Sequence, residues 1–200
     1  MAFDFLKKKQ EKQNGSIASE DGQSTKQLGN LSLDELGDIM VYQFYQNGEP
    51  IRLSGEDEKF IHTSIDTLRE FFKENHIAFD VSTQGTEAKI LHFGMSIQGE
   101  PTDVLIAIFL KPKMCSIVFK LPFKANVTME AELYSALMKY NCTRRFGSFI
   151  YDKNDGEIDY KTDFPCADGV KKEDFVAAFI ISMNSISKFM EELKRYVVPK

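Results

Sequence analysis

The spacing of hydrophobic residues changes along the chain from the period of a helix to that of strands. After Ser54, the stretch GEDEKFIHTSIDTLREFFKEN carries one helical stripe of apolar side chains, namely Ile61, Ile65, Leu68 and Phe72. Ser54, with Asp57 three residues later, predicts a capped helix start, and Asn75 predicts a left-handed residue at the helix end. We therefore expect a helix over residues 55–75.

Alternating or short, wholly apolar segments follow, punctuated by Gly and Pro. They predict strands at residues 78–83, 89–97, 103–110 and 114–121. Thr128 is expected to cap a second helix over residues 129–141. A long helix over residues 171–196 closes the chain. Its predicted apolar face consists of Val176, Phe179, Ile180, Met183, Ser187, Met190 and Leu193.

The third predicted strand is apolar at successive positions rather than at alternate ones. One side of this strand carries Val104, Ile106, Ile108 and Leu110, and the other carries Leu105, Ala107 and Phe109. An antiparallel strand with one face in water should alternate apolar and polar residues. The pattern therefore predicts a central strand with both faces covered. Three candidates can cover the second face of this strand: residues 31–53 folding back, a second copy of the chain, or an extended segment of a client protein.

The segment DKNDGEID (residues 152–159) resembles a calcium-binding loop. Aligning Gly156 with the invariant glycine of an EF-hand puts Lys153 at a ligand position and Thr162 where the bidentate glutamate belongs. The flanking segments FGSFIY and EIDYKTDF both have the character of strands. An Asn-Asp-Gly sequence suits a hairpin turn, because glycine adopts positive φ readily. We therefore predict a hairpin and no metal site.

The first 53 residues differ in character from the rest. Residues 1–30 are polar and are predicted to be disordered, because they offer little surface to bury. Residues 31–53 carry enough apolar side chains to pack on the domain or on a partner. Residues 54–200 form the predicted domain. The tip FDFLKKK, at residues 3–9, provides an alternative function as a peripheral membrane adaptor.

The amino-acid composition of the chain narrows the classes of protein to which it can belong. The 200 residues are 42% hydrophobic and include 17 Phe, which suits one globular domain. A net charge of −5 argues against a nucleic-acid binder. Three scattered cysteines do not make a disulfide framework and suit the cytoplasm. The most apolar run, VLIAIFL, is far shorter than the roughly 20 residues that a membrane span needs.

No residue pattern in the chain indicates a reaction, a cofactor or a metal site. An enzyme with an unrecognised site, using Cys142 or His92, remains the alternative from another class. Basic and aromatic residues occur together once, in KYNCTRRFG. The candidate residues for binding an acidic or aromatic partner in this segment are Tyr140, Arg144, Arg145 and Phe146.

The C-terminal half resembles the YbjN-like proteins, which are described as bacterial sensory transduction regulators with a type III secretion chaperone-like fold. The resemblance covers roughly residues 54–198 and rests on the order of the elements and on a spaced pattern. The residues of that pattern are Asn141, Arg145, Phe146, Gly147, Asp155, Gly156, Pro165, Glu173 and Phe175. The resemblance implies a small, acidic, non-enzymatic protein that binds other proteins, often as a dimer among the secretion chaperones.

We therefore expect an α+β fold. An antiparallel sheet of about five or six strands should carry the first and last helices on one face. The expected function is a protein-binding regulatory or chaperone-like module acting through an apolar surface. Its partner is a protein or a second copy of the chain, and no catalytic residue, cofactor or metal is expected.

Overall fold

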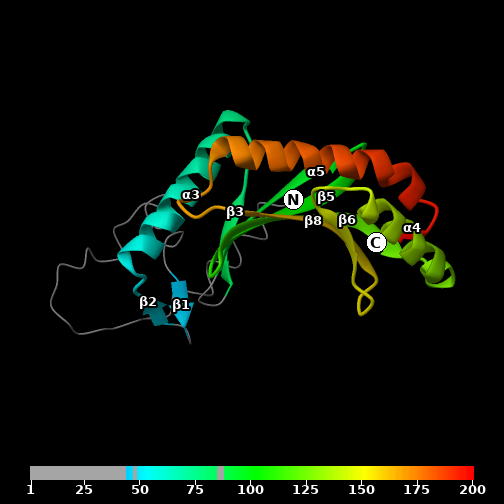
Figure 1. Cartoon of the computed structure of the whole chain (residues 1–200), viewed down its shortest axis with the longest axis horizontal. Coiled ribbons are helices and arrows are strands. Elements are labelled where there is room, and N and C mark those ends of the chain that lie inside the picture. Colours follow the sequence, from blue (N-terminus) through cyan, green and yellow to red (C-terminus); the bar gives the residue numbers. More distant parts are fainter. Residues whose placement is uncertain (1–43, 47–48, 85–87) are drawn as a thin grey trace, which may run out of the picture. The chain divides into compact units, whose positions relative to one another are not determined.

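The computed structural model describes residues 44–46, 49–84 and 88–200 (Figure 1). The predictions for residues 1–43, including the disordered tail and the FDFLKKK segment, lie outside the described residues. Within the extension predicted to pack on the domain or a partner, Phe44 is buried, and Ile51 and Leu53 pack against the core.

The elements follow the predicted order. The strands are β1 (Phe44–Gln46), β2 (Glu49–Ile51), β3 (Asp80–Gln84), β4 (Ala88–Ile97), β5 (Glu100–Leu110), β6 (Lys113–Ala125), β7 (Ser148–Tyr151), β8 (Glu157–Pro165) and β9 (Val197–Pro199). The α-helices are α3 (Gly55–Glu74), α4 (Glu130–Cys142) and α5 (Lys172–Leu193), and a 3-10 turn, η2 (Val127–Met129), precedes α4.

All strands pair in antiparallel fashion. The main sheet has the order β3-β4-β5-β6-β8-β7, with β9 added beside the end of β6, while β1 and β2 form a separate hairpin. This confirms the predicted α+β fold. The sheet has seven strands rather than five or six, because the three-residue β9 was not expected. Strand β5 lies between β4 and β6, so its predicted central position is confirmed.

The helices α3 and α5 lie on the same side of the sheet in Figure 1. Helix α3 begins as predicted, because the Ser54 side chain accepts a hydrogen bond from the Asp57 backbone N–H at 3.2 Å. Its buried stripe matches the predicted one. A cluster of phenylalanines joins the two helices to the sheet, with Phe72, Phe175 and Phe179 in ring contact with one another or with Phe93.

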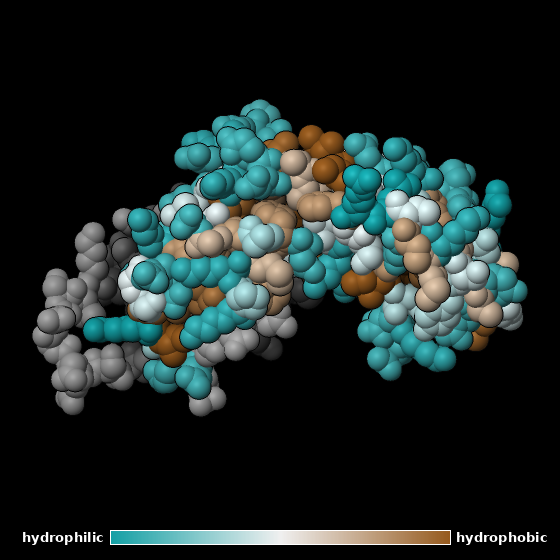
Figure 2. Space-filling view, in the orientation of Figure 1, coloured by the Kyte–Doolittle hydropathy of each residue, from teal (hydrophilic) through white to brown (hydrophobic). Residues whose placement is uncertain are grey.

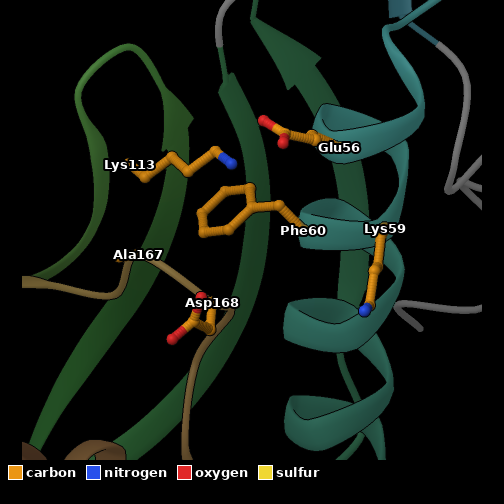
Figure 3. A pocket seen from close by; sticks show the side chains of 6 residues that line it. All are labelled: Glu56, Lys59, Phe60, Lys113, Ala167 and Asp168. Atoms are coloured by element: carbon orange, nitrogen blue, oxygen red, sulfur yellow. The ribbon is translucent and has the colours of Figure 1, made fainter.

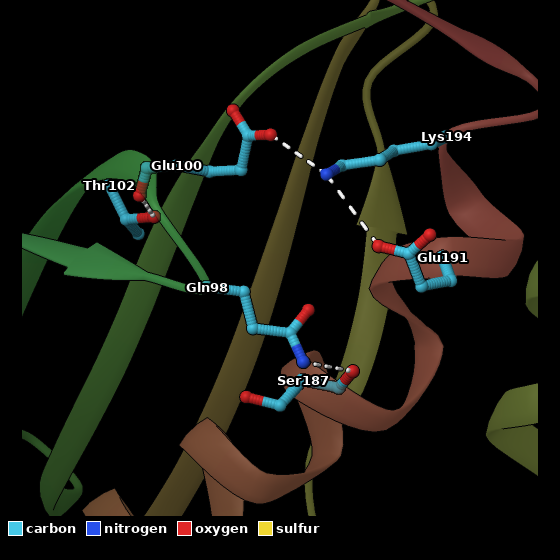
Figure 4. Close-up of polar contacts among 6 residues, drawn as sticks. All are labelled: Gln98, Glu100, Thr102, Ser187, Glu191 and Lys194. Carbon is cyan, nitrogen blue, oxygen red and sulfur yellow. Dashed lines mark hydrogen bonds and ion pairs between the residues drawn. The ribbon is translucent and has the colours of Figure 1, made fainter.

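Polar contacts fix the far end of α5 against the turn between β4 and β5 (Figure 4). The Gln98 side chain donates a hydrogen bond to the Ser187 carbonyl at 3.1 Å. The Lys194 ammonium lies 2.9 Å from Glu100 and 3.7 Å from Glu191. The predicted turn at residues 99–101 is tighter than expected: Gln98 and Gly99 both have positive φ, as in a two-residue hairpin, and β5 already starts at Glu100.

Two local predictions are wrong and a third is correct only in part. The residue with positive φ after α3 is His76 rather than Asn75, whose side chain instead donates to the Phe71 carbonyl. Asn126, not Thr128, caps the turn that leads into α4. The predicted face of α5 is correct only in part: most of its members are buried or pack against the core, whereas Ile180 is 51% exposed. The buried face of α5 consists of Phe175, Ala178, Phe179, Ser182, Ser185, Ile186, Phe189, Met190 and Leu193.

The DKNDGEID segment forms the turn of the β7–β8 hairpin, as predicted. The carboxylates of Asp152 and Asp155 accept hydrogen bonds from backbone N–H groups of the turn itself, both at 2.8 Å. Gly156 has φ of +77° and ends the turn. These carboxylates therefore shape the turn.

Candidate functional site

The register of the sheet assigns alternate residues of each strand to two faces. On β5, Val104, Ile106 and Ile108 point toward the helices. The residues between them point away, and the register places them beside residues of β4 and β6. We call these outward-pointing apolar residues the open face: Ile90, Leu105, Ala107, Phe109, Met114 and Val118.

No described helix lies over the open face. Val104, Ile106 and Ile108 are 0% exposed, whereas the open-face side chains are half-buried apart from the small Ala107. Among the described residues, Ala107 is buried, whereas the five larger side chains neither belong to the core cluster nor pack against it. Helix α4 also packs on the helical side, because Tyr140 contacts the ring of Phe149. The predicted second cover of β5 is therefore not provided by any described element.

Charged residues of both signs flank the open face. Lys161 and Asp163 of β8 form an ion pair of 3.2 Å beside Val118, and His92 lies 3.6 Å from Asp103 beside Leu105. All four side chains are at least about a third exposed. The surface thus has an apolar centre and a rim of mixed charge, which is the anatomy of a protein-binding patch.

Two buried polar atoms on this side of the sheet lack a hydrogen-bond partner among the described residues: Ser116 Oγ and Asp159 Oδ1. The register places Ser116 between Ala107 and Asp163, and it places Asp159 beside Lys120. Burial raises the pKa of the Asp159 carboxyl, although nearby Lys120 and Lys200 oppose the rise. Buried polar groups are normally satisfied in folded proteins, so these two are exceptions within the described structure.

The candidate residues at the corner between α4 and β7 have different environments. Tyr140 is half-buried and packs against the core: its hydroxyl donates to the Ser185 carbonyl at 2.5 Å, and its ring lies 4.3 Å from that of Phe189. Phe146 packs against the core. The Arg144 guanidinium lies 4.2 Å above the Tyr140 ring, and Arg145 is exposed. The structure thus brings Tyr140 and Arg144 together and leaves both arginines accessible.

The histidine and the cysteines that could act in catalysis lie on different elements and do not form one cluster. His92 lies at the rim of the open face on β4, and Cys142 is exposed at the last residue of α4. Burial raises the pKa of Cys166 to about 11 and that of Cys115 well above its ordinary value, which makes both thiols poor nucleophiles. In the described part of the chain, no group of His, Cys, Asp and Glu is suited to hold a metal ion.

A cavity of about 390 Å³ lies where the start of α3 meets the β5–β6 turn and the loop after β8. Figure 3 shows Lys113 over the ring of Phe60, at 5.4 Å from its centroid, with Asp168 on the other side of the ring. The remaining lining residues are Glu56, Lys59 and Ala167. Two lysines and two carboxylates balance in charge, so the cavity does not favour a ligand of either sign.

The outer surface of the helices is mostly hydrophilic, as Figure 2 shows. One hydrophobic patch appears over α5, where Ile180 and Ile181 are exposed. No helix in the described residues is long and apolar enough to cross a membrane.

A model of the YbjN family, described as "Putative bacterial sensory transduction regulator", matches residues 64–195, which is more than half of the chain. The chain belongs to the YbjN family. The crystal structure of YbjN from E. coli, described as "a putative transcription regulator", matches with a TM-score of 0.51 at 18% identity. The match covers 68% of this chain and 96% of the E. coli chain, and it shows the fold. No curated protein sequence matches the chain.

The structure gives the YbjN-like residue pattern of this chain a physical meaning. The Asn141 side chain bridges to β7, since it donates to the Phe149 carbonyl and accepts from the Phe149 N–H, both at 2.9 Å. Gly147 has φ of +69°, and a Cβ there would overlap Thr162 Oγ1 and Tyr160 Oη. Phe175 is 0% exposed in the core. These residues of the pattern stabilise the YbjN fold and the α4–β7 corner.

The sequence alone does not identify several of the candidate binding residues. The apolar pattern identified the two-sided character of β5, but it could not assign Ile90, Met114 and Val118 to one surface, because that requires the register of three strands. Ser116 and Asp159 carry no signal in the sequence. Their significance comes from burial without a hydrogen-bond partner, which only the packed structure shows.

Proposed function

We propose that this YbjN-family chain is a non-enzymatic regulator that binds an apolar segment of a partner protein on its open face. The observation that carries the proposal is the central, doubly apolar strand β5, which the described helices cover on one side only. A regulator of this kind acts by gaining or losing its partner. The three free cysteines suit a reducing compartment, so we propose that it works in the cytoplasm.

The chemistry of the open face favours a protein over other ligands. A nucleic acid would require a basic surface, whereas the chain has a net charge of −5 and the rim carries both signs. The apolar centre of the open face and its rim of mixed charge match the anatomy of a protein-binding patch.

The energy available from the open face alone is modest. The five larger side chains are already half-buried, so covering each contributes about 1 kcal/mol, or roughly 5 kcal/mol in all. Association costs about 4–15 kcal/mol in lost translational and rotational freedom. We therefore infer that the open face supports a weak, reversible complex unless a second contact assists.

Site-specific photocrosslinking in cells tests the proposal. A photoreactive residue at Val118 on the open face should give a covalent adduct with another protein. The same residue at Asn184, which is exposed on α5, should not. The substitution Leu105→Lys, directly opposite Val118, should abolish the adduct, whereas the matched control Ile180→Lys should leave it intact.

Two outcomes would contradict the proposal. An adduct that persists in the Leu105→Lys variant would show that the open face does not hold the partner. An adduct with the mass of two copies of this chain would make the open face a self-association surface instead, and light scattering would then show a dimer.

A further inference from the structure

We propose that the corner between α4 and β7 is a carboxylate-binding site for an acidic segment of a partner protein, with Arg144 as its principal residue and Arg145 as its second cation. This contact is independent of the open face, although it would provide the additional affinity that the open face lacks. The proposal rests on the geometry of the guanidinium, on its missing partner and on the rigidity of the corner.

Packing holds the Arg144 guanidinium in place. Arg144 Cζ lies 4.2 Å from the centroid of the Tyr140 ring, and Tyr140 is itself held by its hydrogen bond to the Ser185 carbonyl and by its contact with Phe189. A guanidinium held over a ring can still offer the N–H donors of its terminal nitrogens to a carboxylate. Because the orientation exists before binding, less entropy is lost on complex formation.

The corner has positive charge without a counterion. Within the described residues, no ion pair involves Lys139, Arg144 or Arg145. Elsewhere on the described surface, several lysines do pair with a carboxylate. Arg144 Nε is a buried atom with no hydrogen-bond partner. An uncompensated basic corner on a chain of net charge −5 attracts an acidic group to this place specifically.

The local backbone is rigid. Asn141 is bonded to both backbone polar groups of Phe149, and Gly147 packs against Tyr160, whose hydroxyl donates to the Phe146 carbonyl at 2.8 Å. Arg144 already occupies one face of the Tyr140 ring, and Phe146 packs into the core. Of the two partner types that this sequence suggests, the structure thus favours an acidic one over an aromatic one.

Fluorescence anisotropy with a labelled hexaglutamate peptide and the full chain tests the site. Arg144→Ala should weaken binding by about tenfold or more, since hydrogen bonds between charged groups are the strong ones. Arg144→Lys should weaken it nearly as much, because lysine lacks the planar fork, while Arg145→Lys should bind nearly as the natural chain does. Circular dichroism melting checks that each variant is folded.

Two variants serve as controls. Lys188→Ala removes an exposed cation from α5 and should leave peptide binding unchanged. Leu105→Lys alters the open face and should also leave it unchanged, so failure at the corner and failure of the open face are distinguishable. Equal losses of affinity in Arg144→Ala and Lys188→Ala would overturn the proposal, because attraction would then depend on overall charge alone.

The NMR signal of the Arg144 Nε–H group distinguishes the source of the anion. Hexaglutamate should shift this signal, and inorganic phosphate at the same concentration should not. If phosphate alone shifts the signal with equal affinity, the corner is a small-anion site and the assignment to an acidic protein segment is wrong.

Discussion

At the start of β4, Lys89 places an ammonium group in the interior. It is 0% exposed, donates a hydrogen bond to Thr83 Oγ1 at 2.6 Å and lies 4.6 Å above the Phe44 ring. Burial disfavours the charged form and lowers the pKa of Lys89 from 10.5 to about 8. A lysine that is costly to bury in its charged form makes stability depend on pH.

We expect the stability contribution of Lys89 to rise with pH. Between about pH 8 and 10.5 the unfolded chain holds the Lys89 proton and the folded chain does not. The free energy of unfolding therefore increases as pH rises through this window, by about 3 kcal/mol at most. Urea unfolding of the natural chain and of Lys89→Met at neutral pH and at pH 10.5 measures the effect. Parallel pH profiles for the two chains would contradict it.

Gly147 supports the corner that carries Arg144. Replacing it with Ala should lower the free energy of unfolding by about 2–4 kcal/mol, because the position has positive φ and the new Cβ overlaps Tyr160 and Thr162. Gly94→Ala is the matched control, since its nearest neighbour would lie 3.9 Å away. Thermal melting that ranks the two variants as equally stable would show that the close approach at Gly147 is unimportant.

At the scale of elements, α5 shows where the sequence misleads. Its apolar residues allow two overlapping faces that share Phe179, one that also includes Phe175 and the other that also includes Val176 and Ile180. Periodicity allows either face to point toward the core. Packing selects the phenylalanines, because their rings fill the space between α3 and the sheet. Helix α3 has a single clear stripe, and there the sequence prediction is correct.

This reading of α5 predicts a large difference between two substitutions on the same helix. Phe175→Ala should cost about 3–5 kcal/mol of stability, as truncation of a buried ring does. Ile180→Ala should cost less than about 1 kcal/mol, since Ile180 is 51% exposed. Urea denaturation measures the loss of stability in both variants. Comparable losses would show that Ile180 faces the core, as the periodicity of the sequence suggests.

Strand β9 was missed for another reason. It has three residues, and it pairs with the end of β6, which lies more than 70 positions earlier in the chain. Short strands held by distant partners leave no local period to detect. The same limit applies to the candidate sites. Local pattern identified the basic corner and the two-sided β5. The side of the sheet that no described helix covers, and the buried polar atoms without a partner among the described residues, depend on non-local packing.

At the scale of the whole molecule, the helices and the sheet form an asymmetric arrangement. Helices α3, α4 and α5 pack on one side, and the other side shows an apolar centre within a charged rim. This arrangement of the described elements supports the proposal that a partner protein covers the open face. The proposed function depends on the side of β5 that no described helix covers.

Methyl NMR of the full chain with a soluble paramagnetic agent tests that claim most directly. The agent weakens signals of side chains that solvent reaches. We expect it to attenuate the methyl signals of Ile90, Leu105 and Val118 while sparing those of Ile106 and Ile117, which are 0% exposed on the helical side. Equal protection of both groups would show that the open face is already covered in the free protein, and it would contradict the account.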